Sequence, residues 1–148
     1  MFETIVVGTD GSDTAGRAVA QAVQLAGALG ARLLIVSAFE PVAPSRLREE
    51  ARQVPADLEW MVNPREDVNA TLRAAAEQAE EGGIGRVETF AREGDPADAI
   101  LDVAEEQGAD LIVVGNKGMT GAKRFLLGSV PNKISHHSPC SVLIIRTT

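Results

Sequence analysis

Three glycines and a serine frame a nine-residue insert in GNKGMTGAKRFLLGS, residues 115–129, a stretch without any acidic residue. Phosphate groups are bound by backbone N–H groups that no Cβ atom obstructs, and a helix N-terminus strengthens such a site. Gly115 and Gly118 can form an open turn, and Gly128 and Ser129 precede an expected short helix, which Ser129 can cap unless its hydroxyl binds phosphate. The spacing therefore favours an anion site, and the alternative is that these glycines only turn the chain.

The distribution of charge supports a small anionic ligand. All 21 acidic residues lie at or before Asp110, so residues 111–148 carry none. Lys123 and Arg124 within this stretch are interpreted as loop charges rather than phosphate clamps. The formal net charge of −7 argues against general nucleic-acid binding, which requires a basic face.

The composition indicates one globular domain over residues 1–148, since 45% of the residues are hydrophobic and 24% are charged. No apolar run approaches the ~20 residues that span a bilayer, so no membrane span is expected. The N-terminal residues do not resemble a signal peptide. The one cysteine, Cys140, has no internal disulfide partner, which is consistent with a reducing cytoplasm. We interpret Cys140 as a small side chain buried in the core.

Strands and helices alternate along the sequence, which predicts an α/β fold with a parallel sheet and helices on both faces. Hydrophobic runs predict strands over residues 4–8, 32–38, 86–91, 111–115 and 141–146. Helical periodicity, capping residues and glycines predict helices over about 15–29, 67–81, 96–107 and 130–135. Residues 39–66 contain four prolines and the single tryptophan, Trp60, and form a long connection.

Two glycine-containing polar turns leave predicted strands, at Gly8–Asp10 and at Gly115–Gly118. Parallel sheets bind ligands beyond the C-terminal ends of their strands, so the fold is expected to bring these turns together. Asp10 can contact the ligand or shape its own turn. The sequence contains neither G-x-x-x-x-G-K-[ST] nor G-x-G-x-x-G, so it indicates neither a P-loop ATPase nor a dinucleotide dehydrogenase.

The motif Gly115-x2-Gly118-x9-Gly128-Ser129 follows the strand LIVVG and precedes a short helix and SVLIIR. Together with VVGTDGS and REGDPADAIL, it resembles the ATP-binding universal stress proteins over essentially all 148 residues. The resemblance implies one nucleotide-binding domain with a five-stranded parallel sheet of order 3-2-1-4-5. It also implies ATP or another adenine nucleotide across the strand ends, with or without Mg²⁺, and a homodimer that pairs through the C-terminal strand.

The resemblance also implies roles for particular residues. Gly8, Thr9 and Asp10 would face the adenosine, with Asp10 near the ribose. Ala38 stands where the family usually has a valine against the adenine, so the wall is looser here, and Val114 would pack near the base. The positions expected to contact phosphate are Gly115, Gly118, Gly128, Ser129 and Val130.

Four functions are compatible with these residues. The leading hypothesis is a cytoplasmic, homodimeric stress-response regulator that binds ATP. The alternatives are a slow ATP hydrolase, a cyclic-AMP-binding member of the same family, and a partner-binding module in which the nucleotide is incidental. No catalytic or metal-binding residue is assigned: Asp10 is the only acid expected near the phosphates, and the adjacent His136 and His137 diverge by ~100° on a helix.

Overall fold

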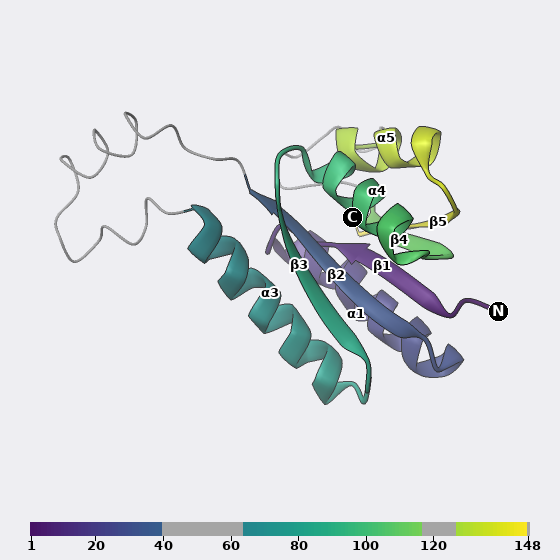
Figure 1. Ribbon diagram of the computed structural model, residues 1–148. Helices are drawn as coiled ribbons and strands as arrows, with labels where there is room; N and C mark the ends of the chain where they lie inside the picture. Colours follow the sequence, from purple (N-terminus) through teal and green to yellow (C-terminus); the bar gives the residue numbers. More distant parts are fainter. Residues whose placement is uncertain (40–63, 117–126, 148) are drawn as a thin grey trace, which may run out of the picture.

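The computed structural model describes residues 1–39, 64–116 and 127–147, with the backbone alone at 64–66. Within these residues five parallel strands form one sheet of order β3-β2-β1-β4-β5, as Figure 1 shows. The predicted single-domain α/β fold and strand order are confirmed. The strands are β1 (Thr4–Gly8), β2 (Arg32–Phe39), β3 (Val87–Glu93), β4 (Leu111–Gly115) and β5 (Ser141–Ile145).

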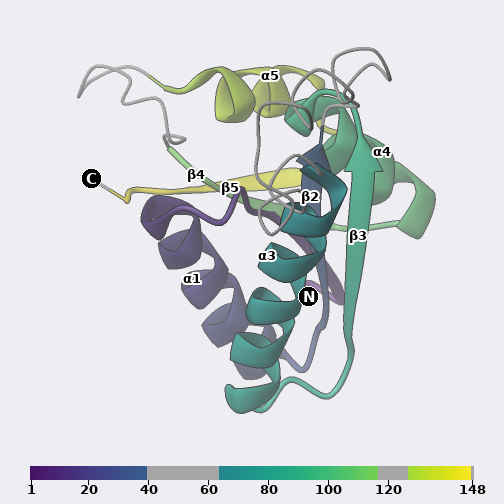
Figure 2. The same cartoon turned by 90° about the vertical axis from the view of Figure 1, so that its left-hand side faces the viewer.

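Helices cover both faces of the sheet (Figures 1 and 2). Those described are α1 (Asp13–Leu29), α3 (Pro64–Glu81), α4 (Pro96–Gln107) and α5 (Ser129–His137). α1 and α3 pack on one face, and α4 and α5 pack on the other. No helix among the described residues is long and apolar enough to cross a membrane.

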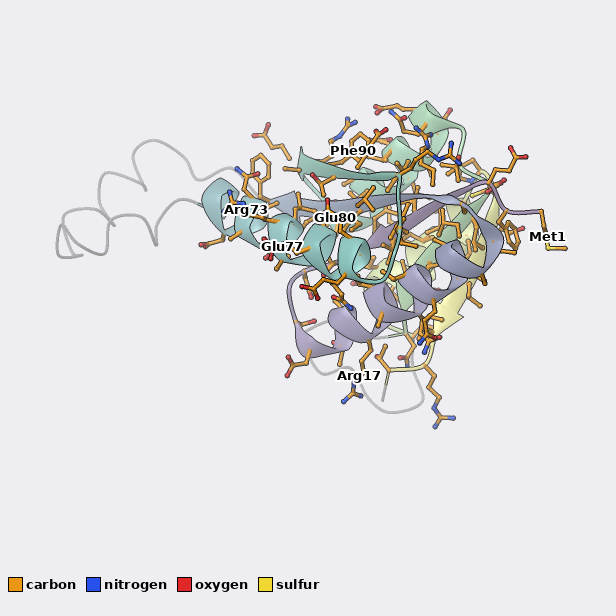
Figure 3. The ribbon with its side chains drawn as sticks, turned by 90° about the horizontal axis from the view of Figure 1, so that it is seen from below. Met1, Arg17, Arg73, Glu77, Glu80 and Phe90 are labelled. Atoms are coloured by element: carbon orange, nitrogen blue, oxygen red, sulfur yellow. The ribbon has the colours of Figure 1, made fainter. Side chains whose placement is uncertain are left out.

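The core has two layers because successive side chains of a strand point to opposite faces of the sheet. In β1, Ile5 and Val7 pack in the layer of α1 and α3, whereas Val6 packs in the layer of α4. Phe90 of β3 contacts the α4 layer, and the charged residues labelled on α3 in Figure 3 are exposed. The continuous apolar runs of the central strands follow from burial on both faces.

The predicted helix ends are set by local capping. The Oγ of Ser12 accepts a hydrogen bond from the amide of Ala15 at 3.2 Å and caps α1, and Asp95 caps α4 through the amide of Asp98 at 3.1 Å. Gly30 and Gly108 end these helices at φ 65° and 64°, a left-handed conformation that glycine adopts without a Cβ clash.

Several predicted details are wrong or shifted. The N-cap of α5 is Gly128, and Ser129 is already helical, so Ser129 does not cap this helix. Leu29, the last residue of the predicted helix 15–29, is 39% exposed because α1 continues beyond its last buried residue, Ala26. β2 and β3 extend further than predicted because Phe39 pairs with Glu93.

The other shifts are small. α3 begins three residues earlier than predicted, and β5 ends one residue earlier. Most of the predicted 39–66 connection, including Trp60, lies outside the described residues.

Asp110 joins the start of β4 to the start of β1. Its carboxylate accepts hydrogen bonds from the amides of Glu3 at 2.9 Å and Thr4 at 3.1 Å. Partial burial raises the pKa of Asp110, but these amide hydrogen bonds outweigh it, so the pKa lies below its usual value.

Replacing Asp110 by alanine should lower the free energy of unfolding by about 1–3 kcal/mol at neutral pH, because two amides lose a charged acceptor. A carboxylate whose pKa is lowered by folding stabilises the protein above its unfolded pKa, and this contribution disappears as the pH falls through the folded pKa. The difference between wild type and Asp110→Ala in urea unfolding should therefore shrink below about pH 4. A difference independent of pH would contradict this assignment.

Candidate functional site

An open cleft lies at the C-terminal ends of β1, β2 and β4. It encloses about 640 Å³ of empty space, a volume that includes the open mouth of the cleft. Seven of the residues predicted from the sequence line it together: Gly8, Thr9, Asp10, Ala38, Val114, Gly115 and Val130.

Two more of the predicted residues are described by the structure but do not line the cleft. Gly128 is buried and Ser129 is exposed at the N-terminus of α5, and neither lines the cleft. Gly118 lies outside the described residues. The structure therefore brings the predicted base and ribose positions together with Gly115 and Val130, and it places Gly128 and Ser129 beyond them.

Among the described residues, five more line the cleft, and none of them was assigned to the site from the sequence: Ala15, Val36, Pro96, Ile100 and Pro131. Pro96 and Ile100 belong to the first turns of α4, and Pro131 belongs to the first turn of α5. The sequence predicted a helix over residues 96–107. It did not predict at which edge of the sheet that helix would begin.

The turn after β1 is shaped by its own side chains. The Oγ1 of Thr9 accepts a hydrogen bond from the amide of Gly11 at 3.1 Å, and Oδ1 of Asp10 accepts one from the amide of Ser12 at 2.9 Å. Gly11 has φ 82°, which favours glycine. Asp10 is therefore a turn-forming residue, and it also lines the cleft with an exposed side chain.

Gly8 allows α4 to approach the end of β1. A Cβ atom on Gly8 would collide with the Cδ1 atom of Ile100, while the next contact, to Cγ1 of Ile100, would be 3.1 Å. Ile100 is buried and forms part of the cleft wall. The predicted site position Gly8 therefore has a packing role that is independent of any ligand.

A backbone hydrogen bond joins the two described ends of the glycine motif, residues 115–129. The backbone oxygen of Asn116 accepts a hydrogen bond from the amide of Gly128 at 2.9 Å. This contact places the end of β4 beside the start of α5, so the two described ends of the motif lie next to each other.

A cluster of charges joins α5 to the start of α4 beside the cleft. The Nζ of Lys133 lies 2.8 Å from Asp98 and 3.4 Å from Asp95. The hydrogen bond to Asp98 raises the pKa of Lys133, and burial opposes this only in part. The amide of Asp98 lowers the pKa of Asp95, with a smaller contribution from Lys133.

These side chains are about half exposed, so the ion pairs stabilise the fold only weakly. They do show that the acid-free stretch of sequence meets acidic residues in space. The Lys133 amine is consequently paired rather than free to bind phosphate.

The remaining candidate groups do not form a metal site. His136 and His137 are exposed with ring centroids 6.5 Å apart, and the described residues contain no group of three or more His, Cys, Asp or Glu side chains that could hold a metal. Cys140 is half-buried, and burial raises the pKa of its thiol, so little reactive thiolate forms.

Comparison with known proteins agrees with this architecture. The model of the universal stress protein family matches residues 1–146. The chain belongs to the universal stress protein family. Universal stress protein Rv1636 of Mycobacterium tuberculosis is 41% identical, with 99% of this chain and 98% of the relative aligned. A universal stress protein of Thermus aquaticus is 40% identical, with 99% and 100% aligned.

Solved structures of universal stress proteins share the fold. A universal stress protein crystallised in complex with cAMP is 37% identical, with a TM-score of 0.73 and coverage of 99% of this chain and 98% of that one. UspA from Lactobacillus plantarum is 25% identical, with a TM-score of 0.78 and 98% of each chain covered.

The packing of Gly8 in this universal stress protein can be tested by a double-mutant cycle. Gly8→Ala should destabilise the fold by about 1–3 kcal/mol, because the new methyl group meets Ile100. Ile100→Val removes the colliding Cδ1 atom, so the double variant should be more stable than the sum of the two single effects predicts. Urea unfolding of all four proteins measures the coupling, and additive effects would show that the new methyl group does not meet Cδ1 of Ile100.

Proposed function

We propose that this universal stress protein binds an adenine nucleotide in the cleft beyond β1 and β4 and acts as a homodimeric cytoplasmic regulator. The observation that supports this proposal most strongly is that residues from the ends of three parallel strands converge in one cleft. The relative in complex with cAMP supports the choice of an adenine nucleotide. Residues 1–148 would form the single nucleotide-binding domain.

The walls of the cleft match the parts of a nucleoside. Val36, Ile100 and Val114 form an apolar wall with Ala38, which suits a flat base. Thr9 and Asp10 add polar atoms where a ribose would lie. Oδ2 of Asp10 makes no hydrogen bond within the described residues, so it can accept one from a ribose hydroxyl.

ATP is the expected ligand because the phosphate positions continue past the cleft. Gly128 and Ser129 lie at the N-terminus of α5 outside the lining residues, so only a ligand with an extended phosphate chain would reach them. Gly128 caps α5 without a side-chain hydrogen bond, which leaves helix amides for an anion. Gly118 remains a predicted phosphate contact.

Cyclic AMP is the second candidate, favoured by the relative that was solved with it. Asp10 is the single carboxylate among the described lining residues. Mg²⁺ is commonly held by one or two carboxylates together with substrate phosphates, so Asp10 fits an ion that arrives with ATP. The alternative of slow hydrolysis rests on this same residue, and the protein is proposed to hold its nucleotide rather than consume it.

Dimerisation is proposed through β5, which lies at the edge of the sheet beside β4. Leu143 is 39% exposed on this strand, and its neighbours Val142 and Ile144 are half-buried. An exposed apolar edge strand favours aggregation unless another chain covers it. Pairing of two such strands across a two-fold axis would cover both.

Nucleotide binding can be tested by filling the cleft. Ala38→Phe should weaken ATP binding about tenfold or more, because its ring would occupy space proposed for the base. Ala109→Phe is the matched control: Ala109 contacts the same core layer outside the cleft, so this variant should bind ATP like wild type. Calorimetry on nucleotide-stripped protein measures both.

Titration with cyclic AMP decides between the candidate ligands. Tighter binding of cyclic AMP than of ATP would favour the second candidate. Failure of wild type to bind either at millimolar concentration would overturn the proposed function.

The dimer can be tested with two leucines of equal exposure. Leu143→Lys should give a monomer in sedimentation velocity, because a charge on the edge strand opposes apolar pairing. Leu29 is also 39% exposed but lies on α1, so Leu29→Lys should leave the dimer intact. A monomeric wild type at tens of micromolar, or a dimeric Leu143→Lys variant, would rule out pairing through β5.

A further inference from the structure

Asn116, a position of the glycine motif to which no role was assigned, makes four hydrogen bonds with other described residues. Its amide donates to the backbone oxygen of Ile145 at 2.8 Å, and its backbone oxygen accepts from Gly128 at 2.9 Å. Its side-chain Oδ1 accepts from the amide and the Oγ1 of Thr147, at 2.8 and 3.0 Å. Asn116 therefore joins the ends of β4 and β5 to the start of α5.

The side-chain contacts are costly to lose because Thr147 is only 2% exposed. A buried donor left without an acceptor destabilises the fold, and Oδ1 of Asn116 accepts hydrogen bonds from both the amide and the hydroxyl of Thr147. The position of the Asn116 side chain is consequently fixed by Thr147, and the backbone of Asn116 is fixed with it.

Thr147 is itself anchored on α1. Its backbone oxygen accepts a hydrogen bond from Nη1 of Arg17 at 2.6 Å, a charge-assisted contact. Arg17 projects from α1 and is labelled in Figure 3. A continuous chain of hydrogen bonds thus runs from α1 through Thr147 and Asn116 to Gly128.

We infer that Asn116 is a positioning residue that sets nucleotide affinity without contacting the nucleotide. It does not line the cleft, whereas its neighbour Gly115 does, and its partner Gly128 caps the helix proposed to face the phosphates. Fixing a binding segment before the ligand arrives reduces the entropy lost on binding. The inference deepens the proposed function and rests on it.

Asn116→Ala tests this against a matched control, Asp110→Ala. Both residues flank β4, and each side chain accepts hydrogen bonds from two donors of a distant segment. Both variants should lose stability, but only Asn116→Ala should weaken ATP binding. The expected loss of affinity is about tenfold, which corresponds to about 1.4 kcal/mol of lost pre-organisation. Equal ATP affinity in the two variants would overturn the inference.

Thr147 provides a graded test with a conservative rescue. Thr147→Val keeps the amide but removes the hydroxyl, so ATP affinity should lie between those of wild type and Asn116→Ala. Thr147→Ser restores the hydroxyl and should restore the affinity. Equal affinities in the valine and serine variants would contradict a role for this hydrogen bond.

Amide hydrogen exchange separates this inference from the proposed function. In ligand-free protein, the Gly128 amide should exchange faster in Asn116→Ala than in wild type or Asp110→Ala, because its acceptor is less firmly held. If wild type binds no nucleotide, the proposed function fails and the exchange rate alone reports whether Asn116 holds the segment. An unchanged Gly128 exchange rate would overturn the positioning role.

Discussion

Parallel pairing of β1 with β4 is the constraint on which the candidate site depends. Ile5, Val6 and Val7 pair with consecutive residues of β4, so both strands end at the same edge of the sheet. The chain then leaves β1 into α1 on one face, whereas α5 packs on the other face. Because the two connections diverge, a cleft opens between them at the switch in strand order.

The depth and shape of this cleft come from how closely the helices approach the strand ends. The absence of a side chain at Gly8 lets Ile100 form part of the wall, and the Lys133 cluster joins the starts of α4 and α5 beside it. The missing side chain at Gly8 therefore makes room for a wall residue, and the charged residues at the starts of α4 and α5 hold these helices together beside the cleft.

Asp10 forms its own turn and also lines the cleft, so the predicted role in the turn is confirmed and contact with a ligand stays a prediction. Oδ1 fixes the turn after β1 by accepting the amide of Ser12, and the same exposed carboxylate lines the cleft. A side chain already ordered by its own turn is well suited to bind, since little further entropy is lost. In the proposed function it would orient a ribose rather than drive hydrolysis.

The elements that could be predicted from the amino-acid sequence are those whose signals are local. Hydrophobic runs predicted the strands over residues 4–8 and 111–115. Local signals also predicted the helix ends at Asp95, Gly30 and Gly108, because a capping side chain or a left-handed glycine acts on its own neighbours. The turns at Gly8–Asp10 and Gly115–Gly118 were also predicted from their residue types. The strand order and the cleft positions Ala38, Val114 and Val130 came from resemblance to a family.

Contacts between residues far apart in the sequence became known from the fold alone. It placed Ile100 against Gly8, paired Lys133 with Asp95, and joined Asn116 to Thr147, contacts between segments separated by 31 or more positions. It also made Gly128, not Ser129, the cap of α5. The physical reason is that such contacts depend on which face each helix covers and how far each strand extends, and no local pattern of residue types encodes either.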